Sequence, residues 1–395
     1  MLHRYRSVLA APGCARVFAT ALLGRLPQGM SSLAILLLVR AATHSYATAG
    51  VAVGAFAFAC AASAPLQGRL VDRFGRGRIL LPSALLEGVA LSGLVVAAAN
   101  RPPAAALVAL AALAGGLVPP IAPAVRALLR DLLPDAGVRE TAYALEAVIQ
   151  ELIWITGPLV VAIVIAFTSP ASAVLLGAAI CIAGTSLFVS SPGARATGPR
   201  RSADEHTSVF AIPELRILLG PIFLTGLALG AIEVGLPSLA LHAGSRPASG
   251  LLLALWSVGS MTGGLWYGSR AWRTPLQMRY RSLLLAGMIC MAPLIAARTI
   301  PEGMICSLLA GLTIAPVFSC QYALIGRAVP PGVETEAFTW VAAALIGGLA
   351  VGSALGGAAI ASAGVSAPFV LACAATGLAA LSAVRMRVSV ERQPA

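Results

Sequence analysis

The sequence predicts an all-α membrane protein with twelve transmembrane helices, arranged as two pseudo-symmetric bundles of six. Three observations support this fold class. Hydrophobic residues make up 58% of the chain, charged residues 11%, and the mean hydropathy is +0.89, which together exclude a soluble globular protein. The chain also separates into twelve apolar runs, and its arginines gather in alternate connections between those runs.

Each predicted span is an apolar run close to the required length. A transmembrane helix needs about 20 mostly apolar residues, and clusters of Arg, Pro or Gly mark its ends. The predicted spans are 15–39, 46–67, 79–99, 104–128, 141–167, 171–190, 216–241, 248–268, 282–298, 303–326, 337–362 and 367–384. The start of the chain resembles a signal peptide, but Arg16 and Arg25 interrupt its apolar core. We therefore expect an uncleaved first span.

The arginine distribution predicts that both termini are cytoplasmic. With both ends inside, 22 of the 27 basic residues lie in cytoplasmic segments or at cytoplasmic helix ends, and four lie outside. Cytoplasmic loops carry an excess of basic residues, so this asymmetry requires an even number of spans. The net charge of +12 therefore reflects topology in the cell inner (plasma) membrane. We expect contact with the lipid bilayer and none with nucleic acid.

The longest polar interval, 190–214, divides the chain near its middle. It predicts an N-terminal six-helix bundle (1–190), a central cytoplasmic loop (191–215), and a C-terminal six-helix bundle with a short cytoplasmic tail (216–395). The halves look like repeats, because Pro120 recurs as Pro316 about 195 residues later. A repeat of this kind is typical of transporters that bind substrate at mid-membrane between the halves.

The connection between the second and third spans, 68–78, is a dense group of polar residues. Four arginines flank a single acid, Asp72, and Gly68 and Gly75 permit a tight reversal. The residues fit the pattern G-x-L-x-D-R-x-G-R, with Gly77 where a basic residue is usual. This segment resembles the loop between helices two and three of the major facilitator superfamily of secondary transporters.

The resemblance implies a latch between the two halves at the cytoplasmic face. Asp72 and Arg76 would form it, with Asp72 near the start of helix eleven. Arg126, at the cytoplasmic end of span four, is expected to reach Asp72 or Glu146. The expected gating residues are Gly68, Asp72, Arg73, Gly75, Arg76 and Arg126.

Ionisable side chains within the spans are functional candidates, because each costs about 2.5–3.5 kcal/mol or more unless it is paired or faces water. Arg25 lies about ten residues, roughly 15 Å, into span one. Glu151 lies at a similar depth in span five. The resemblance implies that helices one and five are neighbours, so we expect these two side chains to pair. Both a coupling or substrate role for Glu151 and a static buried ion pair remain open.

Glu146 and Gln150 are four residues apart and share one face of span five, while Glu151 is turned by about 100° from Gln150. That shared face is expected to line the cavity. The alternative is that Glu146, near the cytoplasmic end, snorkels or joins Arg130 and Arg139 at the gate.

The resemblance also implies which helices line the cavity, and these helices contain further candidate residues. Glu233 in span seven is a second candidate for binding a proton or cation, and Gln321 and Tyr322 in span ten are candidates for contact with a ligand. Glu87, in the peripheral span three, is expected to pair structurally.

Span five also contains Gly157-Pro158, which frees a backbone carbonyl and bends a helix. The pair resembles half of the antiporter signature of exporters in the superfamily. It therefore favours export over import.

The sequence as a whole predicts a monomeric secondary transporter that works by alternating access and exports a small amphipathic compound in exchange for protons. The alternatives are proton-coupled uptake of a sugar or similar metabolite, and a receptor or lipid-handling protein on the same fold. The chain contains no lysine and hence no ATP-binding G-x4-G-K-[ST] loop. The four histidines and seven cysteines lack ligand spacing, so we expect no cofactor, no metal and no enzymatic activity.

Overall fold

The structure is a computed structural model that describes residues 2–100, 103–196, 209–245 and 248–383. Every regular element within these ranges is a helix. The N-terminal half contains α1 (Leu2–Ala10), α2 (Cys14–Thr43), α3 (Tyr46–Phe74), α4 (Arg76–Ala99), α5 (Ala104–Leu117), α6 (Ile121–Leu132), α7 (Ala136–Phe167), α8 (Pro170–Ser190) and α9 (Pro192–Ala196). The C-terminal half contains η1 (Val209–Ala211), α10 (Pro213–His242), α11 (Ala248–Gly268), α12 (Leu276–Met291), η2 (Ala292–Ile295), α13 (Ile300–Gly311), α14 (Ile314–Ala328), α15 (Glu334–Ala363) and α16 (Ala367–Ser382).

Within the described ranges, eleven helical stretches are long and apolar enough to cross a membrane, and α16 is a shorter apolar helix that corresponds to the predicted twelfth span. The predicted all-helical membrane fold is confirmed, and the predicted span 248–268 coincides with α11. The short helix α1 was not predicted, because it precedes the first apolar run and lacks the length to cross a bilayer. Residues 197–208 of the predicted central loop and the tail from residue 384 lie outside the described residues.

The fourth span of each half is a broken helix. In the first half, α5 ends at Leu117 and α6 begins after Val118-Pro119-Pro120. Proline has no N–H to continue a helix and clashes with the preceding turn, so the break follows from the sequence. In the second half, α13 and α14 are separated at Leu312-Thr313, three residues before Pro316. The repeated prolines therefore mark corresponding bends in the two halves.

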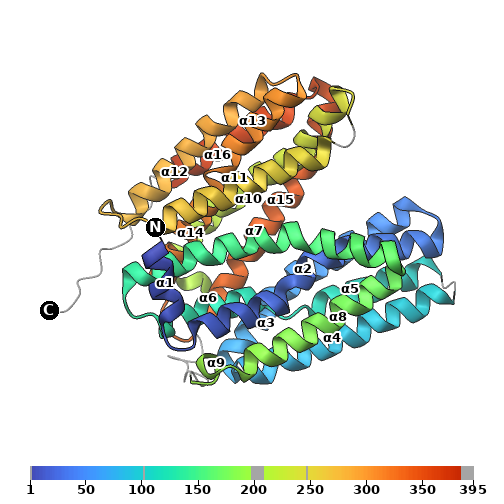
Figure 1. Ribbon diagram of the computed structural model, residues 1–395, viewed down its shortest axis with the longest axis horizontal. Coiled ribbons are helices and arrows are strands. Elements are labelled where there is room, and N and C mark those ends of the chain that lie inside the picture. The colour runs from blue at the N-terminus through green and yellow to red at the C-terminus, as the bar shows by residue number, and fades with distance from the viewer. Residues whose placement is uncertain (1, 101–102, 197–208, 246–247, 384–395) are drawn as a thin grey trace.

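The two halves form separate bundles that meet mainly at one end (Figure 1). Their extensive contacts join α3 to α15, α7 to both α11 and α14, and α6 to α15. The meeting end carries the turns between α3 and α4, α6 and α7, α11 and α12, and α14 and α15, and we call it the arginine-rich end. The bundles diverge away from it in Figure 1, and the N-terminus lies beside it.

The predicted polar loop 68–78 is largely helical, which corrects the sequence interpretation. Helix α3 continues to Phe74, α4 begins at Arg76, and only Gly75 lies between them, with φ +90°. Gly75 therefore makes the reversal alone, since L-residues rarely adopt that conformation. Gly68 serves another purpose, because a Cβ there would lie 2.6 Å from Thr339 Oγ1 and 2.9 Å from Glu336 Cα of α15. The absence of a side chain lets α3 and α15 pack closely.

Candidate functional site

A fully buried ion pair lies at the centre of the N-terminal half. Nη1 of Arg25 on α2 donates to both carboxylate oxygens of Glu146 on α7, at 2.9 and 2.8 Å. Its Nη2 donates to Oε1 of Gln150 at 2.5 Å. The expected pair between Arg25 and Glu151 is therefore wrong. Glu146 and Gln150 share the face of α7 that meets α2, whereas Glu151 is rotated away from that face.

Arg126 on α6 joins the same cluster. Its Nε lies 3.3 Å from Glu146 Oε1, which confirms one of its two predicted partners. Its guanidinium also lies 3.9 Å from the ring centroid of Tyr322 on α14, a cation–π distance. Glu146 is 0% exposed, so the alternative in which it snorkels or joins Arg130 and Arg139 is wrong. One carboxylate thus stands between two guanidiniums.

Glu151 faces the C-terminal half. Its Oε1 accepts a hydrogen bond of 2.9 Å from Ser260 Oγ on α11, and the backbone N–H of Ala315 on α14 donates to that hydroxyl at 3.2 Å. Ser257, on the same helix, lies beside the same carboxylate. The carboxylate of Glu151 is therefore held by groups of the opposite half.

Glu233 on α10 is exposed, yet it lies close enough to Glu151 to interact with it electrostatically. Since Glu151 points at the other half, this proximity places Glu233 on the inner side of the interface. Two carboxylates, one from each half, therefore lie near each other at the interface.

The remaining predicted candidates occupy different surroundings. Tyr322 lies at the interface, within 6.3 Å of the rings of Tyr143 and Phe338. Gln321 points into its own half, where its amide donates to Tyr280 Oη at 3.0 Å and lies 3.5 Å from Thr225 Oγ1. The sequence could not distinguish these neighbours, because the register of α14 against α10 and α12 decides which one meets the interface.

Gly157 and Pro158 lie within α7, which continues from Ala136 to Phe167. A Cβ on Gly157 would lie 2.4 Å from the carbonyl carbon of Gly29 on α2. The two glycines therefore allow the backbones of α2 and α7 to touch, which brings Arg25 within reach of Glu146. Glu87 is buried and accepts a hydrogen bond from Cys181 Sγ at 3.2 Å, a contact within the N-terminal half.

Asp72 lies at the start of α15, where the resemblance placed it. Its carboxylate accepts hydrogen bonds from the backbone N–H groups of Thr335 (3.1 Å) and Glu336 (2.8 Å). The N-cap residue of α15 is Val333, which supplies no side-chain cap. An acid from one half thus satisfies the free N–H groups and the positive dipole end of a helix in the other half. Arg76 lies 3.7 Å from Asp131 of its own half.

Further ion pairs join the halves at the arginine-rich end, and no sequence pattern indicates them. Glu140 on α7 accepts from Arg279 Nη2 at 2.9 Å and from Arg327 Nη2 at 2.7 Å. Arg130 lies 3.7 Å from Glu334. These residues are between about 140 and 205 positions apart in the chain, so no local spacing relates them.

Replacing Asp72 with Asn is expected to loosen the contact between α3 and α15. The substitution removes the charge that interacts with the dipole of α15, a contribution of about 1–2 kcal/mol in a partly buried setting. Amide hydrogen exchange in a peptide covering 334–340 should therefore become roughly 5- to 30-fold faster. Arg78→Gln, which removes an exposed charge from the neighbouring helix, is the matched control. Equal exchange in Asp72→Asn and wild type would contradict the capping role.

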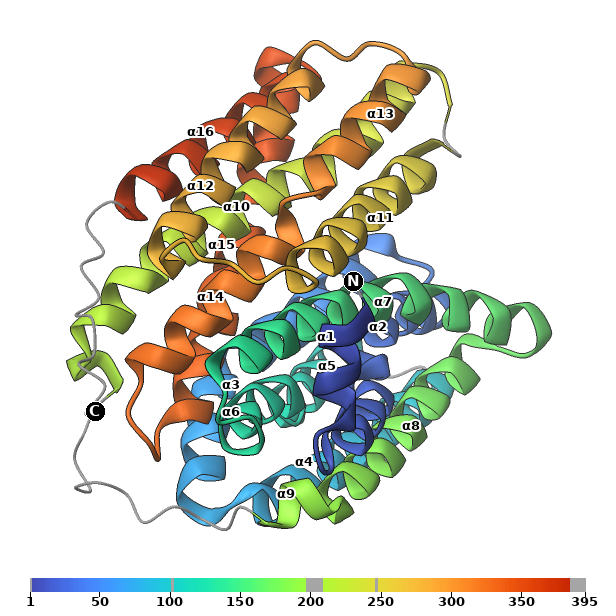
Figure 2. The same cartoon turned by 60° about the vertical axis from the view of Figure 1, so that its left-hand side comes forward.

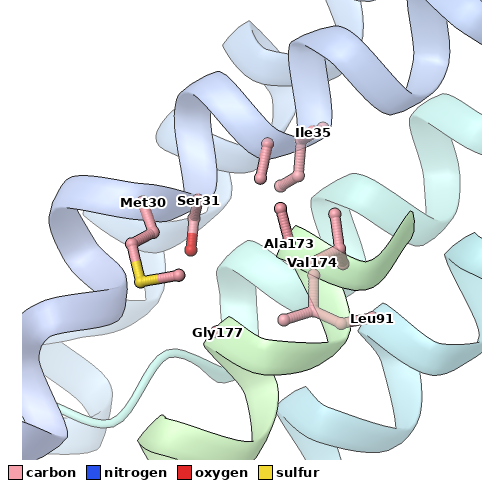
Figure 3. Close-up of a pocket in the computed structure, with 8 residues that line it drawn as sticks. Met30, Ser31, Ile35, Leu91, Ala173, Val174 and Gly177 are labelled. Atoms are coloured by element: carbon pink, nitrogen blue, oxygen red, sulfur yellow. The ribbon is translucent and has the colours of Figure 1, made fainter. Parts of the chain in front are cut away.

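A cavity in the N-terminal half is distinct from this cluster. It is a small cavity between α2, α4 and α8, and Figure 3 shows it lined by Met30, Ser31, Ile35, Leu91, Ala173, Val174 and Gly177, with Ala34 completing the lining. Ser31, its hydroxyl-bearing residue, donates to the carbonyl of Pro27 at 2.8 Å. The cavity has no charged lining residue, so we do not place the functional site there.

The arrangement has the elements of a two-sided gate. Charged and aromatic groups of both halves meet in the middle of the molecule, ion pairs and a helix cap close the arginine-rich end, and the opposite ends of the bundles diverge (Figure 1).

Comparison with known proteins agrees with this geometry. The family model described as Major Facilitator Superfamily matches residues 17–301. Among solved structures, the human organic anion transporter MFSD10 has a TM-score of 0.76 at 19% identity and covers 94% of this chain and 99% of its own. A bacterial homologue of the iron transporter ferroportin in an outward-facing state has a TM-score of 0.78 at 13% identity, with 94% and 98% covered.

The E. coli fucose:proton symporter FucP gives a TM-score of 0.70 at 13% identity, with 95% of this chain and 98% of that chain covered. At these identities the structural likeness shows the fold alone. No curated protein matches the sequence. The family model, however, covers more than half of the chain. The protein is therefore a multi-pass membrane protein that belongs to the major facilitator superfamily, and it is a secondary transporter and not an enzyme.

Proposed function

We propose that this transporter exports a small amphipathic compound in exchange for protons, and that Glu151 carries the proton. The observation that carries the proposal is the position of its carboxylate. It is buried at the interface of the two halves, accepts a hydrogen bond from Ser260 of α11 and lies near Glu233 of α10. A carboxylate in this position changes the contact between the halves when it binds or loses a proton.

The charge state of Glu151 favours one conformation over the other. Ionised, it is a strong acceptor for the Ser260 hydroxyl, which holds α7 against α11 in the middle of the molecule. The ionised form also repels Glu233, which favours separation of α7 and α10 on the opposite side. Protonation weakens the bond to Ser260 and removes the repulsion. It therefore favours opening of the arginine-rich end and approach of the halves at the other end.

We assign the arginine-rich end to the cytoplasm, with both termini inside the inner membrane, because basic residues concentrate on the cytoplasmic side of membrane proteins. The conformation described here then opens outward. The similarity to the ferroportin homologue described as outward-facing supports that assignment. Asp72, with the helix turn at Gly75, serves as the cytoplasmic gate. One chain supplies both sides of the site, so a monomer suffices.

The amphipathic character of the substrate follows from the surroundings of Tyr322. Its ring stacks on Phe318 at 6.2 Å and lies near Phe338, while Arg126 and the carboxylates provide polar contacts. The compound is exchanged for protons if it binds beside Glu151 only when that carboxylate is ionised. The Gly157-Pro158 pair, which resembles part of the exporter signature, supports the outward direction.

Everted membrane vesicles test this function. Vesicles that contain the protein are energised to an acidic interior reported by a ΔpH-sensitive dye, and lipophilic cations, neutral antibiotics and sugars are added one at a time. We expect at least one amphipathic compound to release protons from vesicles that contain the protein and not from vesicles that lack it.

Two other outcomes would replace the proposal. Proton movement with sugars in the opposite sense would identify proton-coupled uptake. Binding of compounds by the purified protein without any proton or compound flux would identify a receptor or lipid-handling protein.

A further inference from the structure

The N-terminal helix α1 touches both halves of the transporter at the arginine-rich end. It packs on α7 and α2 of the N-terminal half, and its Val8 is fully buried in the main hydrophobic core. Figure 2 shows α1 lying beside α7. The helix is too short to span a bilayer, so its position is set by these contacts.

Two neighbouring side chains of α1 reach the C-terminal half. The hydroxyl of Tyr5 lies 3.1 Å from the carbonyl oxygen of Gly264 and 2.9 Å from that of Leu265, near the end of α11. The ring fills the space above Gly268, where a Cβ would lie 2.3 Å from Tyr5 Oη. Burial raises the pKa of Tyr5 to about 12, so the hydroxyl stays protonated and can donate at every physiological pH.

Arg4 bridges the halves directly. Its Nη1 donates to the carbonyl of Arg270, after α11, and its Nη2 donates to the carbonyl of Gly137 at the start of α7, at 3.4 Å. One guanidinium thus holds a backbone group from each half. Since α7 and α11 must separate when the arginine-rich end opens, these contacts cannot all survive the change of conformation.

We propose that α1 is a strap that holds the arginine-rich end closed and that its release is a step of the transport cycle. Packing of Val8 attaches α1 to the N-terminal half, and the hydrogen bonds of Tyr5 and Arg4 attach it to the C-terminal half. The proposal requires only alternation between two conformations, so it stands independently of the coupling ion and the substrate.

Hydrogen exchange of the purified full-length protein tests the strap. The informative amides are those of Thr335 and Glu336 on α15, which donate to Asp72 on α3. Opening of the whole end exposes them, whereas a local change in α1 does not. We expect Tyr5→Phe, which keeps the ring and removes the hydroxyl, to accelerate their exchange by about threefold to tenfold, as for loss of one hydrogen bond.

Arg4→Gln provides a second variant, and Arg6→Gln is its matched control, because Arg6 is an exposed arginine on the same helix. We expect faster exchange at 335–336 in Arg4→Gln and unchanged exchange in Arg6→Gln. The strap is overturned if Tyr5→Phe and Arg4→Gln accelerate exchange only within α1 and residues 264–270. It is also overturned if Arg6→Gln has the same effect as Arg4→Gln.

Discussion

Glu151→Gln is expected to reduce substrate-driven proton flux to the level of protein-free liposomes. Glutamine has nearly the same shape as the protonated carboxyl group and can still bond to Ser260, but it cannot bind or release a proton. The purified variant in liposomes should therefore still bind the compound and exchange it across the membrane. Proton flux and compound exchange, measured on the same preparation, separate the two functions.

Two matched variants sharpen this prediction. Glu151→Asp keeps a titratable group on a shorter side chain and should retain part of the proton flux. Glu233→Gln removes the exposed carboxylate on α10, which is not bonded to Ser260, and should reduce the flux less than Glu151→Gln. If Glu151→Gln transports protons at the wild-type rate while Glu233→Gln does not, the proton carrier is Glu233 and the proposed role of Glu151 is wrong.

Glu146→Gln is expected to produce the largest loss of stability in the central cluster. Glu146 is the carboxylate that both Arg25 and Arg126 approach, at 2.8 and 3.3 Å. Its removal leaves two buried guanidiniums without a counter-charge, and breaking a buried pair in this way costs about 3–5 kcal/mol. The change in stability is measured on the detergent-solubilised protein, which is unfolded by heating in one experiment and by titration with SDS in another.

Arg25→Met should be less damaging than Glu146→Gln, because Arg126 remains beside Glu146 and the cluster keeps one charge of each sign. The double variant Arg25→Met/Glu146→Gln should recover part of the stability lost in Glu146→Gln alone, since it removes one of the two uncompensated cations. If Arg25→Met is the more destabilising single substitution, Arg126 does not share Glu146 and the three-residue cluster is misassigned.

The helices themselves were predictable because a bilayer imposes one length and one composition on every span. Predicted span 248–268 and α11 coincide for this reason. The ends were less accurate where polar residues continue a helix beyond the apolar run. Residues 68–74 remain helical although they read as a loop, because their side chains find partners in α15 and their backbone continues the helical hydrogen bonds to Gly75.

The candidate site was predictable as a set of residues and not as a set of pairs. The cost of burying charge identified Arg25, Glu146 and Glu151 from the sequence alone. Their pairing depends on the rotation of α7 about its axis, and a turn of about 100° between Gln150 and Glu151 directs one toward α2 and the other toward α11. Hydropathy does not report that rotation, because both faces of α7 meet other helices.

The sequence by itself therefore determined the apolar helices, the recurrence of Pro120 as Pro316, and the clustering of arginines in alternate connections, since each follows from local composition acting against a fixed bilayer. Only the tertiary structure decided that Glu151 belongs to the interface, that Glu140 joins Arg279 and Arg327, and that α1 straddles both halves. These contacts join residues more than 100 positions apart, and they depend on how two bundles pack, which no local pattern encodes.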